Sequence, residues 1–194
     1  MLECTALIPF LDGIACSPVI PAVRDPELVP RALQSPGRVV YVLCGTILTI
    51  ESIVRPLCDA GKHAFVNVDL VEGLRSDAAA VQFLQGCGAT GVISTHTEAL
   101  RAARTHGLLA VQRSFLLDSQ AALNALRSLE RFRPDVVELL PAPAAPFVIR
   151  ELNTKHPEVV PTAGGLIKTL AQIDELVRIG IRAVSVSDPE LWIF

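Results

Sequence analysis

The chain is poor in aromatic and charged residues for its length. Of its 194 residues, 5% are aromatic and 19% are charged, whereas 51% are hydrophobic. A core with so few rings must be built from valine, leucine, isoleucine and alanine, which is the composition that buried parallel strands favour. The formal net charge of −3 argues against a general nucleic-acid coat protein and leaves room only for a local basic surface.

Long apolar runs and metal-type cysteine spacings are also missing. No run approaches the ~20 residues that a membrane-spanning helix needs, and the first residues lack the basic stretch of a secretory signal. The five cysteines, Cys4, Cys16, Cys44, Cys58 and Cys87, never form a CxxC pair. We therefore expect small buried cysteines in a cytoplasmic protein, with no membrane contact and no metal site.

Short β-branched runs alternate with helical patterns along nearly the whole chain. The runs expected to form strands are Val19–Val23, Val39–Cys44, Ala64–Asp69, Gly91–Ser94, Leu109–Gln112, Val136–Leu140, Val159–Thr162 and Ala183–Val186. The expected helices are Pro26–Gln34, Leu48–Ala60, Ala78–Gly86, Glu98–His106, Ser119–Arg131, Pro146–His156, Leu170–Ile179 and a short Pro189–Ile193. Eight such units without a linker predict a compact (β/α)8 barrel of the TIM type, a single domain over residues 1–194.

In a parallel barrel, binding groups gather at the carboxyl ends of the strands. Gly164 and Gly165 follow the seventh expected strand, just before a helix N-terminus that suits an anion. Ser185 and Ser187 end the eighth strand, and Lys168 supplies a positive charge nearby. These five residues form the expected phosphate site. The alternative is an ordinary tight turn beside an ordinary strand face.

Further polar residues at the same strand ends are expected to bind the rest of the ligand. They are Arg24, Asp69, Glu72, Arg113 and Glu138. Glu138 lies in an apolar strand, where a carboxylate needs a partner such as Arg113 or Lys168. The alternatives are a structural salt bridge for Glu138, and capping or loop hydrogen bonds for Asp69 and Glu72.

The chain resembles the glycerol uptake operon antiterminator family nearly from end to end. The segments that carry the resemblance are PVIPAVRD (18–25), VNVDLVEGLRSDAAAVQFL (66–84), GVIST (91–95), QRSFLLDS (112–119), PDVVELLPA (134–142), AGGLIKT (163–169) and AVSVSDPELW (183–192). The resemblance implies a non-catalytic barrel regulator that responds to glycerol 3-phosphate as its effector, without a cofactor. It also implies that the protein binds the mRNA leader of a glycerol operon and prevents premature termination of transcription.

Three positions near strand ends depart from the family's usual residues. Thr46 stands where the family often has aspartate, Asn67 where it usually has histidine, and His96 where lysine is common. The phosphate segment is kept. The departures leave open whether the rest of the ligand is the same.

The resemblance does not locate the RNA surface. The best basic surface in the sequence consists of arginines on the fourth and fifth expected helices and just beyond them, Arg101, Arg104, Arg127, Arg131 and Arg133. The alternative is ordinary solvated helix faces. A homo-oligomer that aligns the basic faces of two chains is another open arrangement.

Two other functions remain open from the sequence. One is an aldolase- or isomerase-like enzyme acting on a small phosphorylated polyol or sugar, with acid–base groups among Asp69, Glu138 and Lys168. The other is a phosphate-metabolite binding module that acts through a protein partner. The fold alone cannot choose among these functions, because barrels host many.

Overall fold

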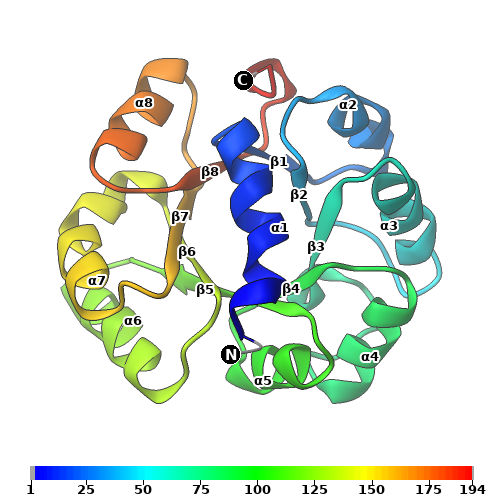
Figure 1. Cartoon of the computed structure of the whole chain (residues 1–194), viewed down its shortest axis with the longest axis horizontal. Coiled ribbons are helices and arrows are strands. Elements are labelled where there is room, and N and C mark those ends of the chain that lie inside the picture. Colours follow the sequence, from blue (N-terminus) through cyan, green and yellow to red (C-terminus); the bar gives the residue numbers. More distant parts are fainter. Residues whose placement is uncertain (1–2, 194) are drawn as a thin grey trace.

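Eight parallel strands close into one barrel in the computed structural model, which describes residues 3–193 (Figure 1). Each strand pairs with its neighbour in sequence, and β1 also pairs with β8. The strands are β1 (Val19–Val23), β2 (Val39–Val42), β3 (His63–Asn67), β4 (Gly91–Ser94), β5 (Leu109–Phe115), β6 (Val136–Leu140), β7 (Val160–Gly164) and β8 (Ala183–Val186). The predicted (β/α)8 architecture is confirmed.

Helices surround the barrel, as Figure 1 shows. They are α2 (Val29–Gln34), α3 (Ile50–Asp59), α4 (Ala78–Gly86), α5 (Thr97–Thr105), α6 (Ser119–Arg131), α7 (Ile149–Lys155) and α8 (Leu170–Arg178). Short 3-10 helices follow four strands: η1 (Pro26–Leu28), η2 (Val68–Leu70), η3 (Ala142–Phe147) and η4 (Pro189–Leu191). Side chains that accept hydrogen bonds from early helical amides begin several helices, Asp118 at α6 among them.

The alternation of side chains along each strand divides the core into two parts. One set of residues packs under the surrounding helices. The other set fills the barrel interior and includes Ile20, Tyr41, Phe65, Ile93 and Val111. A residue two positions along a strand from an interior residue therefore also faces the interior.

An additional helix, α1 (Glu3–Cys16), was not predicted from the sequence. Figure 1 shows it lying across the middle of the barrel, unlike the helices of the outer ring. Phe10 and Ile14 are buried among the interior residues, and the Phe10 ring meets the Phe65 ring edge-on at a centroid distance of 5.3 Å. Helix α1 therefore closes the end of the barrel at which the strands begin.

The four cysteines whose side chains the structure describes are less uniformly buried than predicted, and Cys4 lies outside this described set. Cys87 is buried and Cys44 and Cys58 are half-buried, but Cys16 is exposed at the end of α1, so that prediction is wrong for Cys16. Within residues 3–193, no helix has the length and apolar character needed to cross a membrane.

Replacing Phe10 by alanine tests the role of α1. The side chain is completely buried, so the cavity should lower the free energy of unfolding by about 3 to 5 kcal/mol in a urea titration. Ile8→Ala is the matched control, because Ile8 lies on the same helix with 47% of its surface exposed and should cost at most about 1 kcal/mol. If the two variants lose the same free energy of unfolding, packing of the Phe10 ring in the barrel interior is not what holds α1 in place.

Candidate functional site

Glu138 is a completely buried carboxylate inside the barrel. It lies on β6, two residues after the interior residue Val136, and is paired in register with Arg113 on β5. The Arg113 Nε donates to Glu138 Oε2 at 2.7 Å, and the Ser185 Oγ donates to Glu138 Oε1 at 2.6 Å. Each carboxylate oxygen thus has a donor, and the buried charge is neutralised by a guanidinium that is itself nearly buried.

Gly164 at the end of β7 is required by this arrangement. It is paired in register with Ser185 on β8. A Cβ at this position would collide with Ser185 Oγ and stand 3.0 Å from Glu138 Oε1. The missing side chain lets the β7 backbone pass directly beside the ion pair, so the glycine turn and the buried carboxylate form one local structure.

The turn after β7 has an unusual backbone. Gly165 and Leu166 have φ values of +78° and +61°, and the left-handed conformation is strained for a leucine. The amides of Lys168 and Thr169 donate to the Gln172 side chain at 2.7 and 3.1 Å, and the Thr169 bond is part of a capping box at the start of α8. The amides of the two residues that precede α8 are therefore occupied.

Other amides at this end of the barrel are available. Among residues 3–193, the amides of Gly165, Leu166 and Ser187 donate to no acceptor. Ser187 and Lys168 are exposed at the ends of β8 and of the β7 turn. Unbonded amides beside a hydroxyl and an ammonium group form a suitable environment for an anion.

Asp69 links two loops at the mouth. Its carboxylate accepts hydrogen bonds from Ser76 Oγ, Ser94 Oγ and both the amide and the hydroxyl of Thr95, at 2.6 to 2.9 Å. Partial burial acts to raise the pKa of Asp69, but these hydrogen bonds outweigh it and hold the pKa below its ordinary value. This is the loop-bonding alternative considered for Asp69, and it leaves the side chain few free acceptor positions.

The remaining predicted ligand residues lie at the same end of the barrel. Arg24 is exposed just after β1. Glu72 is also exposed, and its backbone joins the loops after β2 and β3 through hydrogen bonds with Gly45 and Ile47 at 3.0 and 2.8 Å. The structure thus brings Arg113, Glu138, Gly164 and Ser185 into direct contact, whereas Arg24, Glu72, Lys168 and Ser187 line the opening around them.

The three departures from the family pattern have local structural roles or are exposed. Asn67 is buried, and its side chain accepts from the Asp69 amide at 3.0 Å. The Thr46 hydroxyl accepts from the Leu48 amide at 3.2 Å in the loop after β2. His96 is exposed at the start of α5.

Sequence reasoning missed Tyr41. It is completely buried on β2, and its hydroxyl lies near Thr162 but makes no hydrogen bond of good geometry within the described part of the chain. Burial and then the negative charge of Glu138 raise the pKa of Tyr41, so the phenol remains protonated. The alternation in the run 39–43 places residue 41 inside the barrel, and this was the signal available in the sequence.

The predicted RNA-binding arginines fall into two groups. Arg101 lies over the Phe132 ring at 5.5 Å, and Arg104 donates to the Arg133 carbonyl at 2.9 Å, so both side chains on α5 bind the end of α6. Arg133 forms a 3.5 Å ion pair with an exposed glutamate, while Arg127 and Arg131 are exposed on α6. Because α6 ends just before β6 begins, Arg101, Arg104, Arg131 and Arg133 gather at the end of the barrel opposite to the ligand residues.

This arrangement suits binding better than acid–base chemistry. Glu138 has both oxygens engaged, and Lys168 is exposed to water, whereas a Schiff-base lysine needs a desolvated environment. Within the described residues, no three histidine, cysteine or acidic side chains form a group that could hold a metal ion.

Comparison with known proteins finds a matching family model and similar solved structures. The model of the glycerol-3-phosphate responsive antiterminator family matches residues 19–192. A crystal structure of a glycerol uptake operon antiterminator-related protein from Thermotoga maritima is 32% identical, with a TM-score of 0.81 over 90% of this chain and 96% of that one. The glycerol uptake operon antiterminator regulatory protein from Listeria monocytogenes is 30% identical, with a TM-score of 0.83 over 90% and 94% of the two chains.

A curated sequence is equally similar. YgcP, an uncharacterized protein of Escherichia coli strain K12, is 33% identical over 186 residues, which cover 95% of this chain and 96% of that protein. The family model spans nearly the full length of the chain, and each of the two crystal structures covers 90% of it. The chain therefore belongs to the glycerol-3-phosphate responsive antiterminator family.

Proposed function

We propose that the protein is an RNA-binding antitermination regulator that responds to glycerol 3-phosphate bound at the mouth of its barrel, without a catalytic step. The observation that carries the ligand site is the register of Gly164 with Ser185. It sets the glycine turn after β7 beside the serines of β8, on top of the buried Arg113–Glu138 pair.

The phosphate would lie at the turn after β7 and the end of β8. The amides of Gly165, Leu166 and Ser187 are unbonded, and Lys168 lies close by in the chain to neutralise charge. Main-chain amides and a hydroxyl can bind a phosphate with little rearrangement, because the turn already holds its left-handed conformation. The strain of Leu166 is then the cost of presenting these amides.

The glycerol hydroxyls would face the centre of the mouth. Arg113 is nearly buried but still has guanidinium donors beyond the Nε that binds Glu138, and Arg24 is exposed on the opposite side of the mouth. Asp69 is mostly occupied by its own loop and both oxygens of Glu138 are engaged, so Arg113 and Arg24 are the favoured hydroxyl partners.

A carboxylate introduced at the phosphate site should prevent binding. We expect Ser187→Asp to weaken glycerol 3-phosphate binding, measured by isothermal titration calorimetry, by more than about 10-fold through like-charge repulsion. Ser52→Asp makes the same change at an exposed position of α3, one of the helices that surround the barrel, and should leave the affinity unchanged. Wild-type affinity in the Ser187 variant would place the phosphate elsewhere.

RNA binding would use the arginines at the far end of the barrel. Arg131 and Arg133 are exposed there, beside Arg101 and Arg104, and the exposed guanidinium groups can reach phosphates of a single-stranded or looped leader. Contacts of this kind are electrostatic and weaken steeply with salt. Cytoplasmic action, close to transcription, follows from this proposal.

The double variant Arg131→Ala plus Arg133→Ala tests the RNA surface. It should lower affinity for the glycerol-operon leader RNA and reduce the slope of log affinity against log salt by about 1 to 2, without changing ligand affinity. Arg178→Ala plus Arg182→Ala removes two exposed arginines near β8 and serves as the control. If both double variants bind RNA like the wild type across a salt titration in a filter-binding assay, RNA contacts a different surface.

A further inference from the structure

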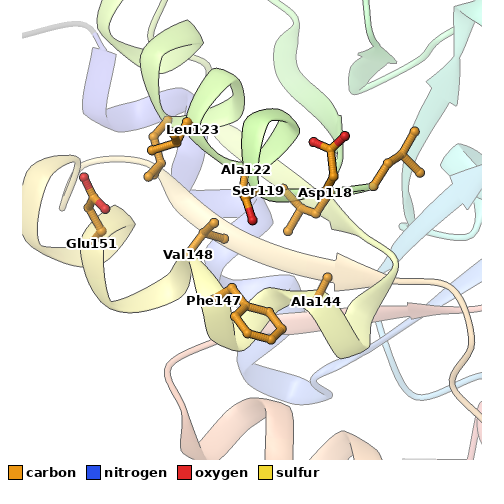
Figure 2. A pocket seen from close by; sticks show the side chains of 11 residues that line it. Asp118, Ser119, Ala122, Leu123, Ala144, Phe147, Val148 and Glu151 are labelled. Atoms are coloured by element: carbon orange, nitrogen blue, oxygen red, sulfur yellow. The ribbon is translucent and has the colours of Figure 1, made fainter.

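A groove opens on the outer wall between α6 and the segment formed by η3 and α7. The loop after β5 and the first turns of α6 form one side, and η3 and the start of α7 form the other (Figure 2). Its volume is about 520 Å³, and most of its lining is apolar. The ligand residues described above do not line it, so the groove is separate from the barrel mouth.

Large apolar side chains stand exposed around this groove. Phe147 is 85% exposed, Leu117 is 81% exposed and Leu123 is 46% exposed. Single exposed apolar residues are ordinary, but three large ones around one concave surface mark a contact site. Among residues 3–193, no segment covers them.

The charges at the groove indicate what kind of partner fits. Asp118 and Glu151 line its two ends, as Figure 2 shows. Glu151 is paired with Lys155 at 2.6 Å, whereas the Asp118 carboxylate disfavours the phosphates of RNA. A second hollow continues from the first through Leu126 and Glu151 and is lined by Arg127 and Glu130. The face therefore carries both signs of charge around an apolar centre, which is the pattern of a protein contact.

We propose that this α6–α7 face binds the same face of a second copy of the chain. A projecting ring, Phe147, and a groove of side-chain size lie next to each other on one surface. In a two-fold contact, each copy can place Phe147 into the groove of the other, and the contact closes after two chains. Charge complementarity supports the same occupant: Arg127 makes no ion pair within the described residues, and a second copy offers it carboxylates such as Asp118 and Glu130.

The contact would connect to the ligand site through the chain itself. Leu117 lies four residues after Arg113, in the loop that follows β5, and η3 follows β6, which carries Glu138. Both strands of the buried ion pair thus lead directly into the proposed interface. The dimer proposal does not depend on glycerol 3-phosphate or RNA binding and is tested without either.

Sedimentation-velocity ultracentrifugation of the purified chain, over a concentration series, measures the proposed association. The wild type should sediment as a dimer, and Phe147→Asp and Leu117→Asp should each raise the dissociation constant by at least about 100-fold, because each charge enters the interface twice. Leu48→Asp is the matched control, since Leu48 is a 90% exposed leucine in the loop after β2 and should leave the dimer intact.

Circular dichroism shows whether each variant keeps its fold, and the high exposure of both substituted side chains makes unfolding an unsuitable explanation for dissociation. A wild-type chain that remains monomeric up to its solubility limit overturns the proposal. So does a dimer that persists in both groove variants, because it would then form through another face.

Discussion

Glu138 has no exposed surface, and the geometry of the candidate site depends on how its charge is neutralised. Arg113 and Ser185 hold the two oxygens, and each comes from a different strand. The register of β5, β6, β7 and β8 must be correct for all of them to meet, and Gly164 must lack a side chain for the backbone to pass. Removing one partner would leave a buried charge unpaired, which is far more costly than losing an exposed contact. The ion pair therefore fixes the relative positions of the strand ends around the proposed phosphate site.

Helix α6 connects three surfaces that are otherwise separate. It begins after the strand that carries Arg113, forms one wall of the apolar groove along its length, and ends among the clustered arginines. A ligand at the mouth can influence RNA at the opposite end only if it favours one of two arrangements of such an element. A subunit contact along α6 offers one such element, because a small shift of the helix would be transmitted to both chains of a dimer.

The fold was predictable because the same pattern, a short β-branched run followed by a helical stretch, occurs eight times in the sequence. Each β-branched run was bounded by helical patterns, and Glu138 stood out as a carboxylate within an apolar strand, which correctly indicated Arg113 as a partner. Helix α1 was missed because it precedes the first strand and is not part of a repeating strand–helix unit. Its burial depends on interior rings such as Phe65, which a local pattern does not reveal.

The details of the site were less predictable, for a related reason. The use of Asp69 depends on donors 7 to 26 residues away, so the sequence could not separate loop bonding from ligand binding. The sequence predicted a basic surface at Arg101 and Arg104. Their contacts with the end of α6 depend on how adjacent helices pack, which the sequence does not show. Tyr41 could be placed inside by alternation, although its unpartnered hydroxyl near Glu138 is visible only in three dimensions.

The most direct test of the ligand site is amide NMR spectroscopy of the isotope-labelled protein, titrated with glycerol 3-phosphate and, in parallel, with glycerol. We expect saturable shifts at the amides of Gly165, Leu166 and Ser187 with glycerol 3-phosphate, because these amides are unbonded and belong to the proposed phosphate site. Glycerol, which lacks the phosphate, should not reproduce them. Shifts confined to the α6–α7 groove or to the arginines beyond α6, or no shift at saturating ligand, would contradict a phosphate site at the mouth of the barrel.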